Sequence, residues 1–261
     1  MDKILIDNMD DLIKILNSFP NNFAYRGQSN EDWGLQTSIE RHIRQFDKMK
    51  SFEDHSIDTF KNNLRIYSKE NNQPNSKLAW LAFMQHYGVP TRLLDFSTSP
   101  YVALYFAIES AEYSIDGNFS LFAIDYSGLV EKSCIYVEKV NANFKKYSAD
   151  FFSQCEAAFD DVIDNNSYDV LWFVDPKYLN SRMEKQGGTF LISGSFSKSI
   201  DDLLESNIYK DVTIKKLLIP KRFFENIYTL LRKMNIGPKS IYGDLSGLAK
   251  HIQLEFKIYG R

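Results

Sequence analysis

The spacing of apolar residues alternates between helical and strand-like periods along the chain. From Asp7 to Phe19 apolar positions recur every three or four residues, which predicts a helix that Pro20 ends. The same criterion predicts further helices at residues 38–46, 56–67, 78–86, 150–163, 222–234 and 245–253. Short apolar runs bounded by turn residues predict strands at 23–28, 117–127, 170–174, 187–193 and 212–219.

Helical and strand-like segments follow one another without the strict repeat of a parallel βαβ fold. We therefore expect an α+β fold in a single domain over residues 1–261 rather than a doubly wound parallel sheet. The sequence has neither a GxGxxG nor a GxxxxGK[ST] loop, so the usual phosphate-binding turns are missing. Any nucleotide site must be built differently.

One stretch, residues 85–107, combines a turn with a high density of polar side chains. It reads Gln-His-Tyr-Gly-Val-Pro-Thr-Arg-Leu-Leu-Asp-Phe-Ser-Thr-Ser-Pro and then becomes apolar. Buried polar groups need hydrogen-bond partners, which a ligand with several polar edges would supply. Ser99 as N-cap and Pro100 in the first turn predict a helix at 101–111, whose N-terminus favours an anion or a carbonyl group. We expect the functional site here.

Composition and charge mainly exclude certain classes of protein and kinds of site. The formal net charge of −3 argues against a protein that coats nucleic acid. Basic residues do gather at 215–233, where we expect a solvated face and, alternatively, a contact to RNA or DNA. Cys134 and Cys155 lack a CxxC spacing and a nearby His, so we expect neither a metal site nor a disulfide framework. No membrane span or signal-peptide core is present, which is typical of a cytoplasmic protein.

Several motifs together resemble the FRG domain family. They are Tyr25-Arg26-Gly27-Gln28 followed by Trp33, the run Gln85–Asp95, the segment Arg182–Phe190, and a tail from Leu218 to Gly247. The resemblance implies a family core over residues 21–250, with an N-terminal helix within residues 1–20. The family by itself implies little about activity.

A second similarity concerns activity. An aromatic residue followed by Arg26 and Gly27 on an early strand, then Ser97-Thr98-Ser99 before a helix, resembles ADP-ribosyltransferases of the arginine–serine–glutamate type. This resemblance implies split, mostly antiparallel sheets flanked by helices, and NAD as substrate. Transfer from NAD breaks the bond between ribose C1′ and nicotinamide through an oxocarbenium-like state. A carboxylate stabilises that state, and a guanidinium clamps the pyrophosphate.

Some residues of this chain match the transferase pattern and others depart from it. Arg26 matches the arginine that holds the NAD phosphate or ribose, whereas the glutamate position falls on Gln186, which cannot carry charge. Either Glu184 serves instead or the site differs, and Glu255 in a Gln-x-Glu sequence is a further choice. The implied catalytic residues are Glu184, Gln186 and Arg26. The candidate NAD-binding residues are Arg26, Gly27, Gln28, His86, Tyr87, Arg92, Ser97, Thr98 and Ser99, of which Arg26 and the hydroxyls at 97–99 match the resemblance.

Each of these residues also has a purely structural interpretation. Arg26 could pair with Asp95, and Arg92 could form a structural bridge with the same carboxylate. The hydroxyls at 97–99 could simply cap the following helix. Trp33 is expected to anchor its loop by packing rather than to stack on a ligand.

The function that we expect is an NAD-dependent ADP-ribosyltransferase, with Tyr87 and His86 lining the nicotinamide pocket. Such an enzyme resembles a toxin or anti-phage effector; its acceptor would be a nucleic acid (RNA or DNA) or a protein, and an antitoxin protein would neutralise it. A first alternative is a non-catalytic module that binds a nucleotide or a protein through a degenerate transferase pocket. A second is a metal-free nuclease or hydrolase built on His86, Asp95 and Glu184.

Overall fold

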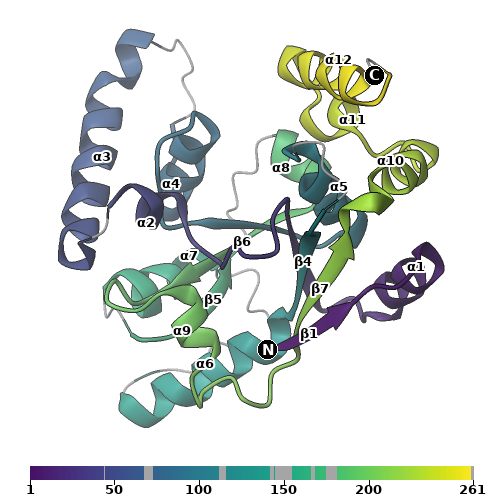
Figure 1. Ribbon diagram of the computed structural model, residues 1–261. Coiled ribbons are helices and arrows are strands. Elements are labelled where there is room, and N and C mark those ends of the chain that lie inside the picture. Colours follow the sequence, from purple (N-terminus) through teal and green to yellow (C-terminus); the bar gives the residue numbers. More distant parts are fainter. Residues whose placement is uncertain are drawn as a thin grey trace.

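The fold centres on one sheet with helices on both sides (Figure 1). The structure is a computed structural model that describes residues 1–43, 45–67, 73–111, 116–141, 144, 155–165, 168–174 and 181–259. Among these residues the sheet has seven strands in the order β1-β7-β4-β2-β3-β6-β5. The strands are β1 (Asp2–Leu5), β2 (Phe23–Gln28), β3 (Leu94–Ser97), β4 (Asn118–Asp125), β5 (Leu171–Val174), β6 (Gly188–Ser193) and β7 (Ile214–Pro220).

Helices connect and cover these strands. They are α1 (Met9–Ser18), α2 (Ser38–His42), α3 (Phe46–Tyr67), α4 (Lys77–His86), α5 (Pro100–Glu109), α6 (Tyr126–Val140), α7 (Cys155–Ala158), α8 (Ser181–Gln186), α9 (Ile200–Leu204), α10 (Phe224–Lys233), α11 (Pro238–Tyr242) and α12 (Leu245–Tyr259). A π-helix, η2 (Phe159–Asp164), follows α7, and a 3-10 turn, η3 (Lys221–Phe223), precedes α10. The mixed α+β architecture that the sequence predicts is confirmed.

The sheet is mostly antiparallel, because β1 and β7 form its one parallel pair among the described strands. Its halves meet at β2 and β3, which share a single residue pair, Tyr25 with Ser97. Beyond that pair the remainder of β2 stays bonded to β4, and the remainder of β3 stays bonded to β6. The two strands therefore diverge beyond this pair, and we call the place where they separate the fork. The split expected from the sequence lies there.

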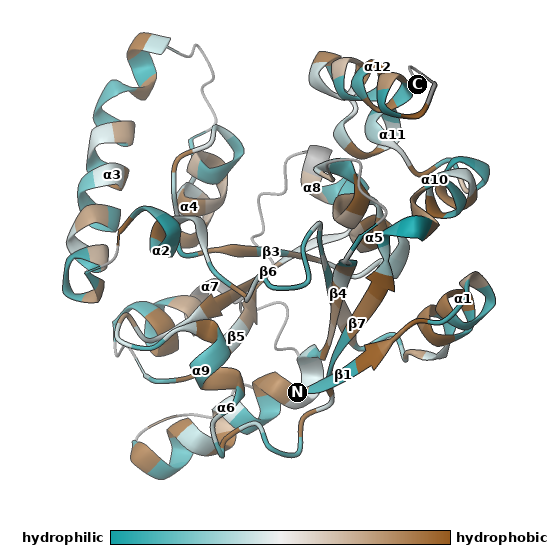
Figure 2. Cartoon of the chain, viewed as in Figure 1, coloured by the Kyte–Doolittle hydropathy of each residue, from teal (hydrophilic) through white to brown (hydrophobic). Residues whose placement is uncertain are grey.

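Two hydrophobic clusters fill the opposite faces of the sheet. One packs α5, α10 and the end of α1 against β4 and β7, with Leu104, Ala107 and Leu217 fully buried. The other packs α4, α6 and the π-helix against β5 and β6, and contains the fully buried Trp172. Figure 2 accordingly colours much of β6 and β7 brown, since most of their side chains are covered on both faces.

The differences from the predicted elements have local causes. Strand β2 spans the predicted residues 23–28, whereas the helix predicted at 56–67 begins at Phe46. Strands β1 and β3 and helices α6, α8 and α9 were not predicted. The two strands are only four residues long and carry a weak periodicity. The helix predicted at 150–163 is described from Cys155 onward, and residues 150–154 lie outside the described part. None of the described helices is long and apolar enough to cross a bilayer.

Candidate functional site

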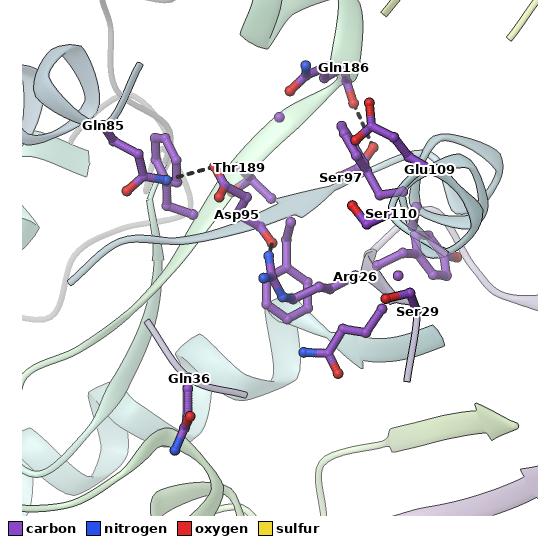
Figure 3. A pocket seen from close by; sticks show the side chains of 18 of the residues that line it. Arg26, Ser29, Gln36, Gln85, Asp95, Ser97, Glu109, Ser110, Gln186 and Thr189 are labelled. Atoms are coloured by element: carbon purple, nitrogen blue, oxygen red, sulfur yellow. Dashed lines mark hydrogen bonds between the residues drawn. The ribbon is translucent and has the colours of Figure 1, made fainter. Parts of the chain in front are cut away.

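A cavity of about 920 Å³ occupies the fork between β2 and β3. Its walls come from β2 and the loop after it, the C-terminal end of α4, strand β3, helix α5, and the segment joining α8 to β6. Figure 3 shows side chains from these elements converging on it. The volume lies within the range of pockets that bind small molecules or cofactors.

Arg26 of β2 is the central cation of the cavity. Its Nη1 donates to the backbone carbonyl of Asp95 across the fork, at 2.7 Å (Figure 3). Its buried Nε has no hydrogen-bond partner among the described residues. Burial lowers the pKa of Arg26; the charge of Asp95 opposes this, and the charge of Arg41 adds to it. Because a guanidinium stays protonated in proteins, two cations, Arg26 and Arg41, border the same cavity.

Gly27 lets helix α5 approach the cavity wall closely. A Cβ at this position would collide with the backbone carbonyl of Ala103 and lie 2.8 Å from the amide nitrogen of Ala107. Any larger residue would push α5 away from β2. The Arg-Gly pair thus places a guanidinium and the helix that follows β3 side by side.

Strand β3 supplies two polar side chains to the cavity, Asp95 and Ser97. The carboxylate of Asp95 is exposed and accepts a 2.8 Å hydrogen bond from Nε2 of Gln85 (Figure 3). Ser97 is buried, and its hydroxyl donates to the backbone carbonyl of Gln186 at 2.6 Å. Asp95 is therefore open to a ligand, whereas Ser97 ties β3 to the end of α8.

The three hydroxyl residues 97–99 mainly hold loops together. Thr98 donates through its backbone N–H to the carbonyl of Gly187 at 2.8 Å, and Ser99 is the N-cap of α5. Gly187 has a φ of +53°, and a Cβ there would lie 2.8 Å from the hydroxyl of Thr98. Ser97 lines the cavity, and Thr98 and Ser99 do not.

Arg26 and Ser97 approach the cavity from different faces of the sheet. Tyr25, rather than Arg26, is the residue paired with Ser97, and side chains alternate along a strand. Both residues nevertheless line one cavity, because it passes through the fork where β2 and β3 are not bonded. Burial raises the pKa of Tyr25 to about 12, so its hydroxyl remains neutral near pH 7.

A further carboxylate, Glu109, lines the cavity at the end of α5. Figure 3 shows it on the same side of the drawn pocket as Ser97 and Gln186, away from Gln36. The hydroxyls of Tyr105 and Tyr242 and the ammonium of Lys250 donate to its Oε1. Such a fixed carboxylate can stabilise a positive charge that develops on a bound ligand.

The loop after β2 covers another part of the cavity. Trp33 in this loop is 52% exposed and lines the cavity, in contrast to the packing role expected from the sequence. The buried ammonium of Lys216 donates to the backbone carbonyls of Glu31 and Trp33, at 2.6 and 3.1 Å. Burial, with Lys3 adding to it, lowers the pKa of Lys216. The expectation that Lys216 belongs to a solvated basic face is therefore wrong, because this side chain supports the loop from beneath.

The structure brings together six of the candidate residues named from the sequence. Lining the cavity are Arg26, Gly27, Gln28, His86, Ser97 and Gln186. Glu184 is exposed on α8 and does not line the cavity, and Glu255 lies on α12, where it contacts His251. Tyr87 is 59% exposed and packs on Phe83, outside the cavity lining.

Arg92 also lies outside the cavity lining. Its Nη2 contacts Oε1 of Glu53 at 2.8 Å and Oδ1 of Asp164 at 2.5 Å. Phe159 and Phe196 place their rings within 5.3 and 4.6 Å of the guanidinium carbon. This side chain therefore forms a structural bridge, with carboxylates other than the expected Asp95.

Sequence reasoning missed Glu109 and did not single out Gln85 as a ligand contact. Glu109 closes an apolar helix, and nothing in the sequence brings Tyr242 or Lys250 near it. Its position as the one charged residue of a buried helix was the available signal. Within the described residues, no three His, Cys, Asp or Glu side chains gather so that they could hold a metal ion.

Comparison with known proteins bears on residues 21–115, which match the family model described as the FRG domain. The matched range contains β2, the polar stretch 85–107 and the whole of α5, and so Arg26, Asp95, Ser97 and Glu109. The segments 182–190 and 218–247, which also resemble the family, lie outside it. No curated protein and no solved structure matches the chain. Over residues 21–115, about a third of its length, the chain is therefore similar to the FRG domain.

Proposed function

We propose that the chain is an NAD-dependent ADP-ribosyltransferase. The observation that carries the proposal is the fork between β2 and β3, where Arg26, Ser97 and a held carboxylate line one cavity. A substrate with an anionic pyrophosphate and a ribose that becomes cationic needs groups of both signs. The cavity offers Arg26 and Arg41 for the first need, and the carboxylate of Glu109 for the second.

The guanidinium of Arg26 would bind the pyrophosphate. Its Nη1 already contacts the carbonyl of Asp95, which fixes the direction of the guanidinium, while Nε has no partner among the described residues. An anion would also relieve the repulsion between Arg26 and Arg41. Charge-assisted hydrogen bonds of this kind are each worth about 1.5–3 kcal/mol.

The reaction proposed for this cavity is group transfer at the ribose C1′. The bond from C1′ to the nicotinamide nitrogen breaks and nicotinamide leaves with the electron pair. An oxygen or nitrogen of the acceptor, in a nucleic acid or a protein, then attacks C1′ and loses its proton. Apolar walls from Phe106, Met183 and Phe190 would limit the access of water, which is a competing acceptor.

The second candidate function is a module that binds a nucleotide without chemistry. Two placements favour it: Gln186, which cannot carry charge, lines the cavity where a transferase glutamate is expected, and Glu184 lies outside. The two functions differ in a single step, because a module would bind NAD and leave its C1′–nicotinamide bond intact.

Release of nicotinamide from NAD by the purified chain tests the proposal directly. We expect turnover in the wild type, and a loss of at least about tenfold in kcat/KM in Arg26→Ala because a charged hydrogen bond is removed. Arg222→Ala is the matched control, since Arg222 is exposed on η3 and lies outside the cavity lining. Saturable NAD binding without nicotinamide release would favour the binding module, and hydrolytic activity without NAD would favour the nuclease or hydrolase alternative.

A further inference from the structure

Glu109 is held more firmly than the other carboxylates that line the cavity. Its side chain is 14% exposed. Three donors contact it: the hydroxyl of Tyr105 at 2.8 Å, the hydroxyl of Tyr242 at 2.6 Å, and the ammonium of Lys250 at 2.9 Å. The rings of Tyr105 and Tyr242 are buried, so the position of the carboxylate is fixed by the core.

All three donors contact the same oxygen of Glu109, Oε1. Within the described part of the chain, no hydrogen bond to Oε2 accompanies them. One oxygen thus anchors the side chain, and the other remains to contact a ligand. A charge held in place before a ligand arrives needs no reorganisation when positive charge develops opposite it.

Two of the three donors come from the C-terminal helices, beyond the residues that match the FRG domain. Tyr242 ends α11, and Lys250 lies on α12 with its ammonium 4.7 Å from the centre of the Tyr242 ring. Lys257 of α12 also donates to the backbone carbonyls of Glu109 and Ala111, at 3.1 and 3.2 Å. Helices α11 and α12 therefore hold the end of α5, and Glu109 with it, at the cavity (Figure 1).

We propose that Glu109 is the catalytic carboxylate of the cavity and that Tyr242 and Lys250 are its positioning residues. This inference rests on the proposed transferase function. Oε2 of Glu109 faces the cation that develops at C1′ and accepts the hydrogen bond of the acceptor O–H or N–H. The C-terminal segment then belongs to the active site although it lies outside residues 21–115.

The other carboxylates fit this role less well. Asp95 is bonded to Gln85 and stands beside Arg26, so it serves the cationic end of the cavity. Asp32 belongs to the loop that carries Trp33. Glu184 lies outside the cavity lining altogether. Glu109 lies on the side of the view that also holds Ser97 and Gln186 (Figure 3).

Steady-state nicotinamide release and equilibrium NAD binding together test the proposal. In Glu109→Gln we expect the Kd for NAD to stay within about threefold of wild type and kcat to fall about 100-fold or more, as when a transition-state contact is removed. In Tyr242→Phe and Lys250→Met we expect kcat to fall about tenfold with KM little changed, and Lys250→Arg to restore part of the loss. Glu131→Gln, on the exposed surface of α6, is the matched control.

The outcomes separate this inference from the function on which it rests. A wild-type chain that releases no nicotinamide, whether or not it binds NAD, overturns the proposed function, and the role of Glu109 with it. An active wild type whose Glu109→Gln variant keeps kcat within about threefold overturns the role of Glu109 alone, as does a loss confined to Glu184→Gln. If Glu109→Gln does not fold, Tyr242→Phe decides, because it removes one hydroxyl and keeps the buried ring: an unchanged kcat overturns the proposal.

Discussion

Arg26 and Arg92 have the same interpretation in the sequence, but one borders a cavity and the other is enclosed by protein. The sequence makes both Arg26 and Arg92 candidates for NAD binding, and both have nitrogens without hydrogen-bond partners among the described residues. Around Arg92 the space is filled by protein: two carboxylates contact one nitrogen, and the rings of Phe159 and Phe196 cover the guanidinium. Around Arg26 the space is a cavity.

The difference shows what a buried cation needs before it can bind a ligand. Arg92 has its counter-charges in Glu53 and Asp164, which makes it part of the scaffold. Arg26 has a backbone carbonyl for one nitrogen and an exposed carboxylate, Asp95, nearby. A bound anion would complete the environment of Arg26, whereas that of Arg92 is complete without one.

Replacing Arg92 should have the largest effect on stability. Arg92→Met leaves the carboxylate of Glu53, which is 1% exposed, without its closest cation. Removing one partner of a buried pair costs about 3–5 kcal/mol, and we expect that loss in the free energy of unfolding, measured in urea. Arg26→Met should change the same quantity by less than about 1 kcal/mol.

The double variant Arg92→Met/Glu53→Met sharpens this test. Replacing a buried ion pair by apolar residues is often neutral, so the double variant should regain much of the lost stability. Equal losses in Arg92→Met and Arg26→Met would contradict the division of the two arginines into a structural one and a ligand-binding one.

Arg26→Lys should separate charge from geometry at the cavity. Lysine keeps the positive charge but lacks the planar set of five donors of a guanidinium. We expect kcat/KM for NAD to fall about 10- to 100-fold, equivalent to one or two charged hydrogen bonds, with little change in the unfolding free energy. A lysine variant that retains full activity would show that Arg26 acts only as a point charge.

The sequence predicts the fold class and the bounds of β2 better than it predicts the rest of the candidate site. Strand β2 begins with three apolar residues after a turn at Pro20, and its bounds were predicted without error. Strand β3 was missed although its residues were singled out, because four residues show too little alternation to indicate a strand. Without β3 the fork could not be located from the sequence.

Long-range partners explain the remaining misses. Arg92 and Asp95 are three residues apart, yet Arg92 pairs with Asp164, far along the chain at the end of a π-helix. Glu109 depends in the same way on Tyr242 and Lys250. Spacing within one segment reports which side chains share a local face, and it carries no information about contacts made by a separate element.

The pH dependence of stability should distinguish the scaffold cluster from the cavity. Burial opposes ionisation of Asp164, but hydrogen bonds and charges of Lys77 and Arg92 outweigh it and lower the pKa of Asp164. A carboxylate with a lowered folded-state pKa adds stability above its unfolded-state pKa, and this stability is lost as the pH falls through the folded-state value. Asp164 therefore stabilises the fold at pH 7 and makes it sensitive to acid.

Asp164→Asn measures that contribution. At pH 7 we expect the free energy of unfolding to be lower than that of wild type by about 1–3 kcal/mol, because charged hydrogen bonds are weakened. The difference should shrink below pH 4, as Asp164 of the wild type becomes protonated. Glu53, whose pKa burial raises, is present in both proteins. A difference that stays constant down to pH 2 would contradict the assignment.

Trp33→Ala should produce the smallest effect, and one confined to the cavity. The indole is 52% exposed and lines the cavity, and its loop is held by backbone contacts from Lys216 rather than by packing of the ring. We therefore expect a stability change within about 0.5 kcal/mol. If the ring stacks on a base or on nicotinamide, KM for NAD should rise about five- to tenfold, corresponding to about 1 kcal/mol of stacking, and Trp33→Phe should rise less. A large loss of stability with unchanged KM would instead place Trp33 with Arg92, among the residues that build the scaffold.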